Sequence, residues 1–257
     1  MSEQRFTIGA DPELLLLTAR GLPKSAIGLI GGTKQNPKPF GIGHVQEDNV
    51  MVEFNIPPAN NRHEFQVYIS EMMTDIKRFF GKKDLYVGDK GEAFFDPEEL
   101  NHPNALAFGC EPDYDVWEMK ENPKPIPPSP EYRCCGGHIH LGFDTSKYDI
   151  VKLTKLLDLY VGVPLAVNDP NTTRKQFYGK AGCIRITEYG LEYRTPSNYW
   201  VVRGWAGQVY DLVDQAFDMY DYIEPNEVRE QILDCLNLGL VDQVFTLHDI
   251  YKYRSII

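Results

Sequence analysis

The chain has 257 residues, of which 42% are hydrophobic and 25% are charged, a composition typical of a globular protein with a large buried core. The net charge is −11 and no basic stripe appears, which argues against a nucleic-acid backbone as the main partner. No apolar run approaches the roughly 20 residues of a membrane span, and the first residues lack the apolar core of a signal peptide. We therefore expect a cytoplasmic protein without a membrane partner.

The five cysteines favour a reducing compartment over a disulfide framework, because their number is odd and no C-x-x-C is present. Cys134 and Cys135 are sequence neighbours and cannot readily bridge to each other. We interpret all five as packing residues. A thiolate ligand from Cys134 or Cys135 is the minor alternative, because both precede a pair of histidines.

The first half of the chain alternates short apolar runs with turns. Arg5–Ile8 is expected to form the first strand and Leu14–Leu17 its continuation, with a kink, bulge or edge at Pro12, which cannot donate to a ladder. Val50–Asn55 is expected to form another strand. The turn-rich stretch Gly28–Gly43 contains two lysines and favours a surface connection, although it could also close over phosphates.

Helical periodicity is clearest at Asn61–Phe80, where apolar residues recur at intervals of three and four. Asp149–Val163 has a similar pattern, and Pro164 is expected to end or kink that helix. From about residue 199 the chain reads as helical, with a stripe from Val202 to Tyr220 and shorter helices from about Asn226 and Leu240.

Between these helices the sequence predicts a strand near Ala105–Cys110 and an extended loop at Asn122–Pro130, which contains five prolines. The motif G-C-E-P-D, which contains Glu111 and Asp113, echoes G-A-D-P-E at Gly9–Glu13. A second group of carboxylates at that place is speculative, because so short a match also arises by chance.

Two strands, Cys183–Glu188 and Leu191–Thr195, are predicted to flank a tight turn at Tyr189-Gly190. Strands followed by helices predict an α+β fold with an antiparallel or mixed sheet and helices packed on one face. No linker divides the sequence, so residues 1–257 are expected to form a single domain, helical from about residue 199.

Two histidines in C-C-G-G-H-I-H-L-G-F are the strongest functional signal. In a strand, residues two apart point to the same face, so His138 and His140 should lie together while Ile139 and Leu141 enter the core. Alone, the pair fits a water-facing strand equally well.

Three other polar pairs have the same spacing next to apolar residues: Asp11 with Glu13, Glu53 with Asn55, and Glu192 with Arg194. A face with five such groups suits Mg2+, or Mn2+, more than a structural zinc ion; the expected ligands are Asp11, Glu13, Glu53, His138 and Glu192. Without cations, so many carboxylates would raise one another's pKa and cost stability.

Cationic side chains from the hairpin region could hold a polyphosphate against such ions: Arg174, Lys180, Arg185 and Arg194. An ion-pair network on the sheet is the alternative for each pair considered singly. The sequence contains no G-x-x-x-x-G-K-[ST], which excludes a P-loop. Neither a G-x-S-x-G nor an H-E-x-x-H motif is present, which weakens a hydrolase interpretation.

The order of these motifs resembles the phage-type COOH.NH2 ligase (type 2) family, an amidoligase group of the glutamine synthetase and glutamate–cysteine ligase superfamily. The resemblance extends from Gly9 to about Asn198 and rests on the acidic pair, V-E-F-N-I-P-P, C-G-G-H-I-H, R-K-Q-F-Y-G-K-A-G-C-I-R and E-Y-R-T-P-S-N. It implies a glutamine-synthetase-like catalytic domain, an enzyme that uses ATP and Mg2+ to join a carboxylate to an amine through an acyl phosphate.

Carried over by position, the resemblance implies that Glu13 and Glu53 hold the ion nearest the acid substrate. Asp11, His138 and Glu192 would hold the ion that bridges the nucleotide phosphates. Asp11 departs from the superfamily pattern, which has a glutamate there, so its coordination could run through water.

The resemblance further implies that Arg194, Arg185, Arg174 and Lys180 contact phosphate and that His140 lies near the transferred phosphate or the substrate carboxylate. The expected partners are small-molecule or peptide acids and amines, in the host cytoplasm if the protein is phage-encoded, and association into oligomers is left open. A metal-dependent phosphotransferase or nucleotidase, and a non-catalytic binding protein that retains the fold, are the alternatives.

Overall fold

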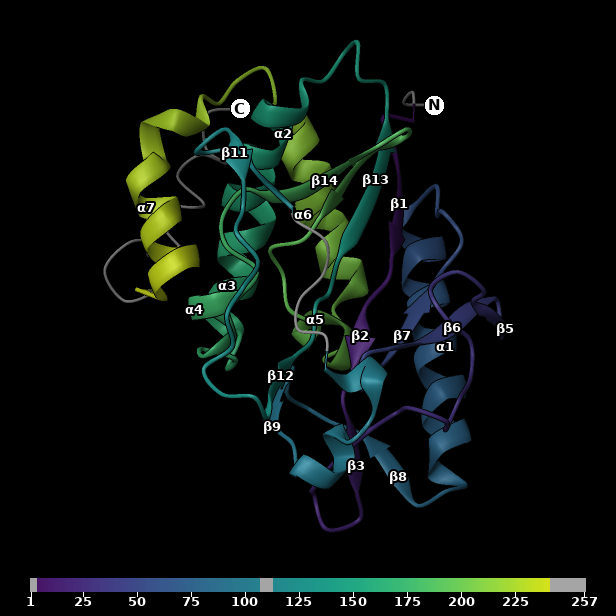
Figure 1. Ribbon diagram of the computed structural model, residues 1–257. Helices are drawn as coiled ribbons and strands as arrows, with labels where there is room; N and C mark the ends of the chain where they lie inside the picture. Colours follow the sequence, from purple (N-terminus) through teal and green to yellow (C-terminus); the bar gives the residue numbers. More distant parts are fainter. Residues whose placement is uncertain (1–3, 107–112, 241–257) are drawn as a thin grey trace.

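Six antiparallel strands form the sheet around which the structure is arranged (Figure 1). The computed structural model describes residues 4–106 and 113–240. Across this sheet, called sheet A, the order is β1 (Phe6–Ala10), β13 (Ile139–Phe143), β15 (Gly190–Tyr193), β14 (Cys183–Thr187), β10 (Tyr114–Asp115) and β11 (Lys120–Glu121). The predicted α+β class is confirmed, while the likeness to glutamine synthetase and the single-domain organisation stay predictions.

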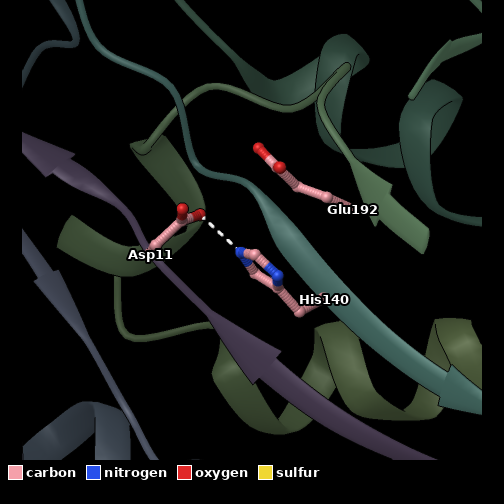
Figure 2. A group of neighbouring side chains, drawn as sticks. All are labelled: Asp11, His140 and Glu192. Carbon is pink, nitrogen blue, oxygen red and sulfur yellow. Dashed lines mark ion pairs between the residues drawn. The ribbon is translucent and has the colours of Figure 1, made fainter. Parts of the chain in front are cut away.

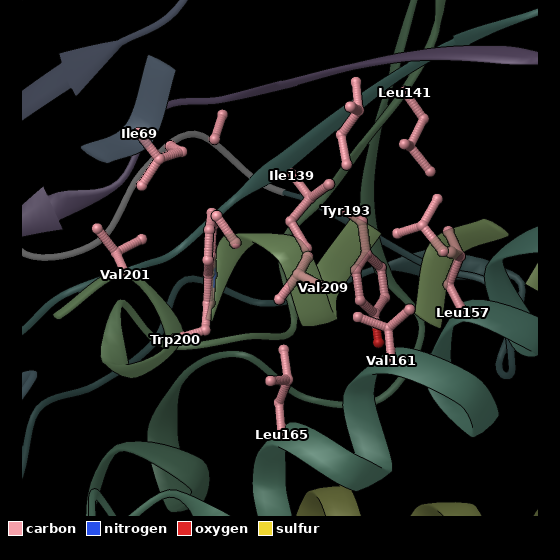
Figure 3. Close-up of a cluster of buried hydrophobic side chains, with 14 of the residues drawn as sticks. Ile69, Ile139, Leu141, Leu157, Val161, Leu165, Tyr193, Trp200, Val201 and Val209 are labelled. Atoms are coloured by element: carbon pink, nitrogen blue, oxygen red, sulfur yellow. The ribbon is translucent and has the colours of Figure 1, made fainter. Parts of the chain in front are cut away.

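Helices cover one face of sheet A (Figure 1). They are α2 (Ile150–Leu157), a π-helical segment at Asp158–Gly162, α3 (Val163–Asn168), α5 (Tyr199–Val202) and α6 (Ala206–Asp218). Ile139, Leu141 and Tyr193 point from the sheet toward Val161 and Val209 of the helical layer (Figure 3), and all five side chains are buried. Because successive strand residues alternate in direction, the residues between them emerge on the opposite, open face.

A four-stranded sheet, called sheet B, adjoins sheet A. Its strands in order are β2 (Glu13–Leu14), β7 (Met51–Asn55), β6 (Gly43–Asp48) and β5 (Lys38–Phe40). The long helix α1 (Arg62–Gly81) lies along it (Figure 1), with Phe79 packed edge-on against Phe40. Asn61 caps α1 by accepting a hydrogen bond from the Glu64 amide at 3.0 Å, which confirms the helix predicted at Asn61–Phe80.

The chain crosses from sheet A to sheet B at Asp11 and Pro12. Strand β1 ends at Ala10 and β2 begins at Glu13. Pro12 lacks an N–H group, but its carbonyl accepts from the Phe54 amide at 3.3 Å, so the kinked passage predicted from the sequence is present. This crossing brings the acidic residues of the first strands to the junction of the two sheets.

Further short strands and helices lie beside the two sheets. A three-stranded sheet contains β4 (Pro23–Lys24), β3 (Leu16–Thr18) and β8 (Leu85–Val87), and β9 (Glu92–Phe94) pairs with β12 (Tyr132–Cys134). Two short helices, α4 (Arg174–Phe177) and α7 (Arg229–Leu233), flank the main helical layer. None of the helices in the described ranges is long and apolar enough to cross a membrane.

The loop expected at Gly28–Gly43 was wrong, and of the two alternatives expected at Pro164 the helix does not end there. The predicted connection Gly28–Gly43 contains strand β5 and the first residue of β6. The helix continues past Pro164 to Asn168, and a π-helical segment precedes the proline. Such a wider turn accommodates a residue whose ring and missing N–H would break a regular α-helix.

The hairpin turn lies one residue earlier than predicted. Thr187 pairs with Gly190, so Glu188 and Tyr189 make the connection. Gly190 is needed for another reason, because a Cβ there would lie 2.3 Å from the Leu141 carbonyl oxygen.

Several other predictions fall outside the described residues or at their edge. Most of the strand predicted at Ala105–Cys110 lies outside the described residues, as do Glu111 and all but the first residue of the helix predicted from Leu240. Ala105 itself ends a 3₁₀ turn.

Candidate functional site

Cross-strand register places three polar side chains in a row on the open face of sheet A. His140 lies opposite Glu192, and Glu192 lies opposite Arg185. On the other side of His140 the neighbouring residue is Gly9, which has no side chain to cover the imidazole. Asp11 therefore reaches the ring (Figure 2), and its Oδ1 lies 2.9 Å from His140 Nε2.

His138 joins the same group from the residue that precedes β13. Its Nδ1 lies 3.4 Å from both Asp11 Oδ1 and Glu192 Oε1. Its Nε2 lies 3.2 Å from the hydroxyl of Tyr178. The structure thus brings both histidines to the same two carboxylates, as the spacing of two predicted. We call Asp11, His138, His140 and Glu192 the histidine cluster.

The charges of the histidine cluster compensate one another. Burial alone would raise the pKa of Asp11, but His140 and His138 hold it well below its usual range. Burial opposes the charged form of His140, yet Asp11 raises the pKa of this imidazole above its ordinary value. Asp11 and His140 therefore stabilise each other as an ion pair.

Two guanidinium groups pair with Glu192. Arg185 donates through Nη1 to Glu192 Oε2 at 2.7 Å, and Arg194 donates to the other carboxylate oxygen. Although burial opposes ionisation, His138 and Arg194 lower the pKa of Glu192. Arg194 Nε also lies 3.4 Å from Asp113. An ion at Glu192 would have to compete with both arginines, which is the ion-pair alternative raised from the sequence.

The buried polar atoms at this place that make no hydrogen bond within the described part of the chain include Asp11 Oδ1, His140 Nε2 and Arg185 Nη2. Asp11 and His140 are close but poorly aligned for a hydrogen bond, and the Tyr189 hydroxyl, 2.6 Å from His140 Nδ1, fixes the ring orientation. Buried polar atoms normally have partners. The carboxylate oxygen and, once it has lost its proton, the imidazole nitrogen suit a metal ion, and a guanidinium N–H suits a phosphate oxygen.

A second acidic group lies on sheet B. Glu13 is opposite Glu53, and Glu53 is opposite Gln46. Asp48 completes the group, and oxygens of Glu13, Asp48 and Glu53 all lie within 4.8 Å of one another. No lysine or arginine of residues 4–106 or 113–240 forms an ion pair with these three, which we call the carboxylate trio.

Burial and mutual repulsion outweigh the favourable contacts of the carboxylate trio, one of which is the Gly136 amide that donates to Glu13 Oε2 at 2.7 Å. Burial raises the pKa of Glu53 well above its ordinary value, and the charges of Asp11, Asp48 and Glu13 raise it further. Burial and then Asp48 likewise raise the pKa of Glu13. A divalent cation would remove this penalty, and three carboxylates are the oxygen ligands that Mg2+ and Mn2+ prefer.

Asp48, Tyr178 and Tyr189 were missed by the sequence reasoning. Gln46 and Asp48 have the same spacing of two that identified the other pairs. Strand β6 was not predicted because its turn to β7 contains no glycine; Asn49 instead takes the left-handed conformation with φ 56°, which asparagine tolerates better than most residues.

Arg174 and Lys180 do not reach either acidic group. The Arg174 guanidinium donates to the carbonyl oxygens of Thr195 and Pro196 at 3.0 and 3.1 Å. Lys180 Nζ donates to the Asn237 carbonyl oxygen at 3.0 Å. Their assignment as phosphate contacts stays a prediction that lacks support from the geometry.

Residues 127–234 match the family model described as phage phiEco32-like COOH.NH2 ligase-type 2. The predicted family resemblance is confirmed over this part of the chain, and the family name indicates a carboxylate–amine ligase. The match includes His138, His140, Glu192 and both arginines that pair with Glu192, whereas the carboxylate trio precedes it. No curated protein sequence matches the chain significantly.

Proposed function

Proceeding from the family match over residues 127–234, we propose that this chain is an enzyme that uses ATP and Mg2+ to join a carboxylate to an amine through an acyl phosphate. One observation carries the proposal: the carboxylate trio lies beside the histidine cluster and its arginines, because Asp11, Glu53 and His140 border one cavity. The carboxylate trio suits a divalent ion, and the histidine cluster with its arginines suits a phosphate and an ion together.

The chemistry needs two steps because a free carboxylate is a poor acyl donor. An oxygen of the substrate carboxylate attacks the γ-phosphorus of ATP, the bond to the ADP oxygen breaks, and an acyl phosphate forms. The amine nitrogen then attacks the acyl carbon and gives up a proton while the bond to phosphate breaks. The products are the amide, ADP and inorganic phosphate.

The residues present fit the ions that this chemistry requires. Glu13, Asp48 and Glu53 would hold one ion, and Asp11 Oδ1 with His140 Nε2 or His138 would hold another. When bound, Mg2+ offsets the negative charge of the phosphates and of the substrate carboxylate.

The chain's own side chains position the phosphate. Arg185 Nη2, a buried donor with no acceptor in the described ranges, would bind a phosphate oxygen. Glu192 orients Arg185 and Arg194 through its two carboxylate oxygens. Tyr189 holds the His140 ring so that Nε2 faces Asp11. Because Glu192 already has these partners, its role as a metal ligand stays a prediction.

The proposal is tested by measuring ADP formation with a panel of acids and amines. We expect turnover that needs Mg2+, an acid and an amine together. His138→Ala and Glu192→Gln should abolish it while leaving the circular dichroism spectrum unchanged, and His63→Ala, on the exposed surface of α1, should behave as the wild type. Turnover without amine would favour the nucleotidase alternative, and full activity in either site variant would contradict the assignment.

A further inference from the structure

A carboxyl group is completely buried on the face of sheet A opposite the candidate site. Asp158 begins the π-helical segment that follows α2, and none of the residue is exposed. Its hydrogen-bond partners belong to neither the histidine cluster nor the carboxylate trio. Burial opposes the charged form of an acid, and π-helical turns are frequent at functional sites. An acid at this position therefore calls for a reason beyond packing.

Asp158 accepts hydrogen bonds from three separate parts of sheet A. Its Oδ2 accepts from the indole nitrogen of Trp117, in the turn between β10 and β11, and from the amide of Gly182, just before β14, both at 2.6 Å. Its Oδ1 accepts from the Tyr193 hydroxyl on β15 at 2.7 Å and from Thr195 at 3.4 Å. The Tyr193 hydroxyl points from the sheet into the helical layer (Figure 3). One carboxyl group thus ties the starts or ends of these strands together from behind.

The same strands carry, on their other face, the side chains proposed to bind and orient phosphate. Arg185 lies three residues after Gly182, and Glu192 and Arg194 lie on either side of Tyr193. Neighbouring strand residues point to opposite faces, so a bond that fixes Tyr193 from behind also fixes where Glu192 and Arg194 emerge. Because Glu192 pairs with an arginine from each strand, the arrangement of β14 against β15 decides whether both contacts form.

The donors around Asp158 match a carboxylate better than a carboxylic acid. An N–H group can only donate, so the two donors at Oδ2 leave no place for a proton on that oxygen. A proton on Oδ1 would be donated to the Tyr193 hydroxyl, which would then have to turn its own hydrogen away. The three short bonds, at 2.6 to 2.7 Å, are also typical of an ionised acceptor. Protonation of Asp158 therefore loosens its hold on β15.

We propose that Asp158 is a positioning residue for the proposed reaction: as a carboxylate, it holds β14 and β15 from behind in the arrangement in which Glu192 orients both arginines. The inference rests on the proposed function, because Asp158 acts only through the residues that would bind the phosphates and contacts no substrate itself. Burial makes the ionised form costly for stability. Activity that depends on this form explains why an acid, and not an amide, occupies the position.

The charge of Asp158 changes near neutral pH. Burial raises its pKa to about 7, and the charge of Asp115 on β10 acts in the same direction. Burial also raises the pKa values of Cys183 and Tyr193 well above their ordinary range, so both stay neutral while Asp158 titrates. Lys155 of α2 is turned toward the indole that donates to Asp158, with Nζ 4.7 Å from the ring centre. Helix α6, which packs against the π-helical segment, buries apolar side chains there.

The test compares the wild type with Asp158→Asn, which keeps the shape of the side chain but has no charge at any pH. Its amide nitrogen can only donate to Tyr193, so the variant is held in the arrangement of the protonated wild type. Two quantities are measured on the full chain between pH 6 and pH 8.5. They are kcat for amine-dependent ADP formation and, by isothermal titration calorimetry, the affinity for a non-hydrolysable ATP analogue with Mg2+.

The ratio of the wild type to the variant isolates Asp158, because every other titrating group is common to both proteins. We expect the neutral form to have roughly a tenth of the activity of the ionised form. With a pKa of about 7, the kcat ratio should then rise from about 2 at pH 6 to about 10 at pH 8.5. The affinity for the nucleotide analogue should change in the same direction.

Two further variants serve as comparison and control. Tyr193→Phe should also lower kcat at pH 8.5, and adding Asp158→Asn to it should cost less than Asp158→Asn costs alone, because Asp158 acts on β15 through this hydroxyl. Asp221→Asn, which is exposed after α6, should match the wild type throughout. Urea unfolding at the same pH values shows that each variant is folded.

Ratios of kcat and of nucleotide affinity that both stay constant with pH would overturn the inference, as would an Asp158→Asn variant with full activity at pH 8.5. The ligase proposal would stand in either case. Nucleotide affinity that follows the ionisation of Asp158, without amine-dependent turnover, would support the positioning role and contradict the ligase. A wild type that binds no nucleotide at any pH would contradict both.

Discussion

Replacing Glu53 with glutamine should stabilise the protein in the absence of metal ions. Glu53 is buried against Glu13 and Asp48, with oxygens of the three within 4.8 Å of one another. At that separation and an effective dielectric constant of about 20, each pair of charges repels by about 3.5 kcal/mol. The observable gain is smaller, about 1 to 3 kcal/mol, because a carboxyl group can take up a proton instead.

The gain in stability from Glu53→Gln depends on pH. The pKa of Glu53 is raised above its ordinary value of 4.5, so its contribution to stability is present at low pH and is lost as the pH rises through the folded-state pKa. The Glu53→Gln variant does not lose stability in this way, because glutamine does not titrate. Its advantage over the wild type should therefore be larger at pH 8 than at pH 5, and Mg2+ should stabilise the wild type much more than the variant.

Thermal unfolding in EDTA and in Mg2+ measures both effects. For a domain of this size about 2 to 4 °C of Tm corresponds to 1 kcal/mol, so we expect a rise of roughly 3 to 10 °C for Glu53→Gln in EDTA at pH 8. Glu71→Gln, exposed on α1, should change neither Tm nor the response to Mg2+. A variant that unfolds at a lower temperature in EDTA, or that keeps the full response to Mg2+, would refute the reasoning.

Two further predictions concern stability. Burial raises the pKa of Asp158 to about 7, so the stability that this residue contributes is lost as the pH rises from about 4 through 7. In Asp158→Asn, the amide oxygen can still accept from Trp117 and the amide nitrogen can donate to the Tyr193 hydroxyl. Urea unfolding should show this variant to be more stable than the wild type by about 1 to 3 kcal/mol at pH 8 and nearly unchanged at pH 4. Equal pH dependence in both proteins would count against this. Gly32 and Gly21 both have positive φ, but only at Gly32 would a Cβ meet other atoms. Gly21→Ala should therefore cost about 1 kcal/mol and Gly32→Ala clearly more, and equal losses in urea unfolding would contradict the close packing at Gly32.

The regular spacing of apolar residues predicted those helices and strands that bury one face and expose the other. The helix at Asn61–Phe80 and the shared face of His138 and His140 follow from spacings of 3.6 and 2 residues. The turn into the hairpin was misplaced by one residue, because Gly190 reads as a turn glycine but is needed for contact with β13. Local sequence does not distinguish these two requirements.

Long side chains were the least predictable part of the site. Arg174 and Arg185 begin and end the motif R-K-Q-F-Y-G-K-A-G-C-I-R. The Arg174 guanidinium donates to backbone carbonyls, whereas the Arg185 guanidinium pairs with Glu192. Their directions depend on tertiary packing that no sequence spacing encodes. Asp48 was missed for a simpler reason: its strand ends in an asparagine turn, and the pair formed with Gln46 was not recognised.

In the proposed mechanism, carboxylates that are far apart in the sequence converge to bind divalent ions beside a nucleotide. Crystals soaked with Mn2+ and a non-hydrolysable ATP analogue test it most directly, because anomalous scattering locates the ions. We predict one ion bound by Glu13, Asp48 and Glu53, with the terminal phosphate next to Arg185 and His140. Carboxylates without an anomalous peak, or a nucleotide bound away from both groups, would contradict the account.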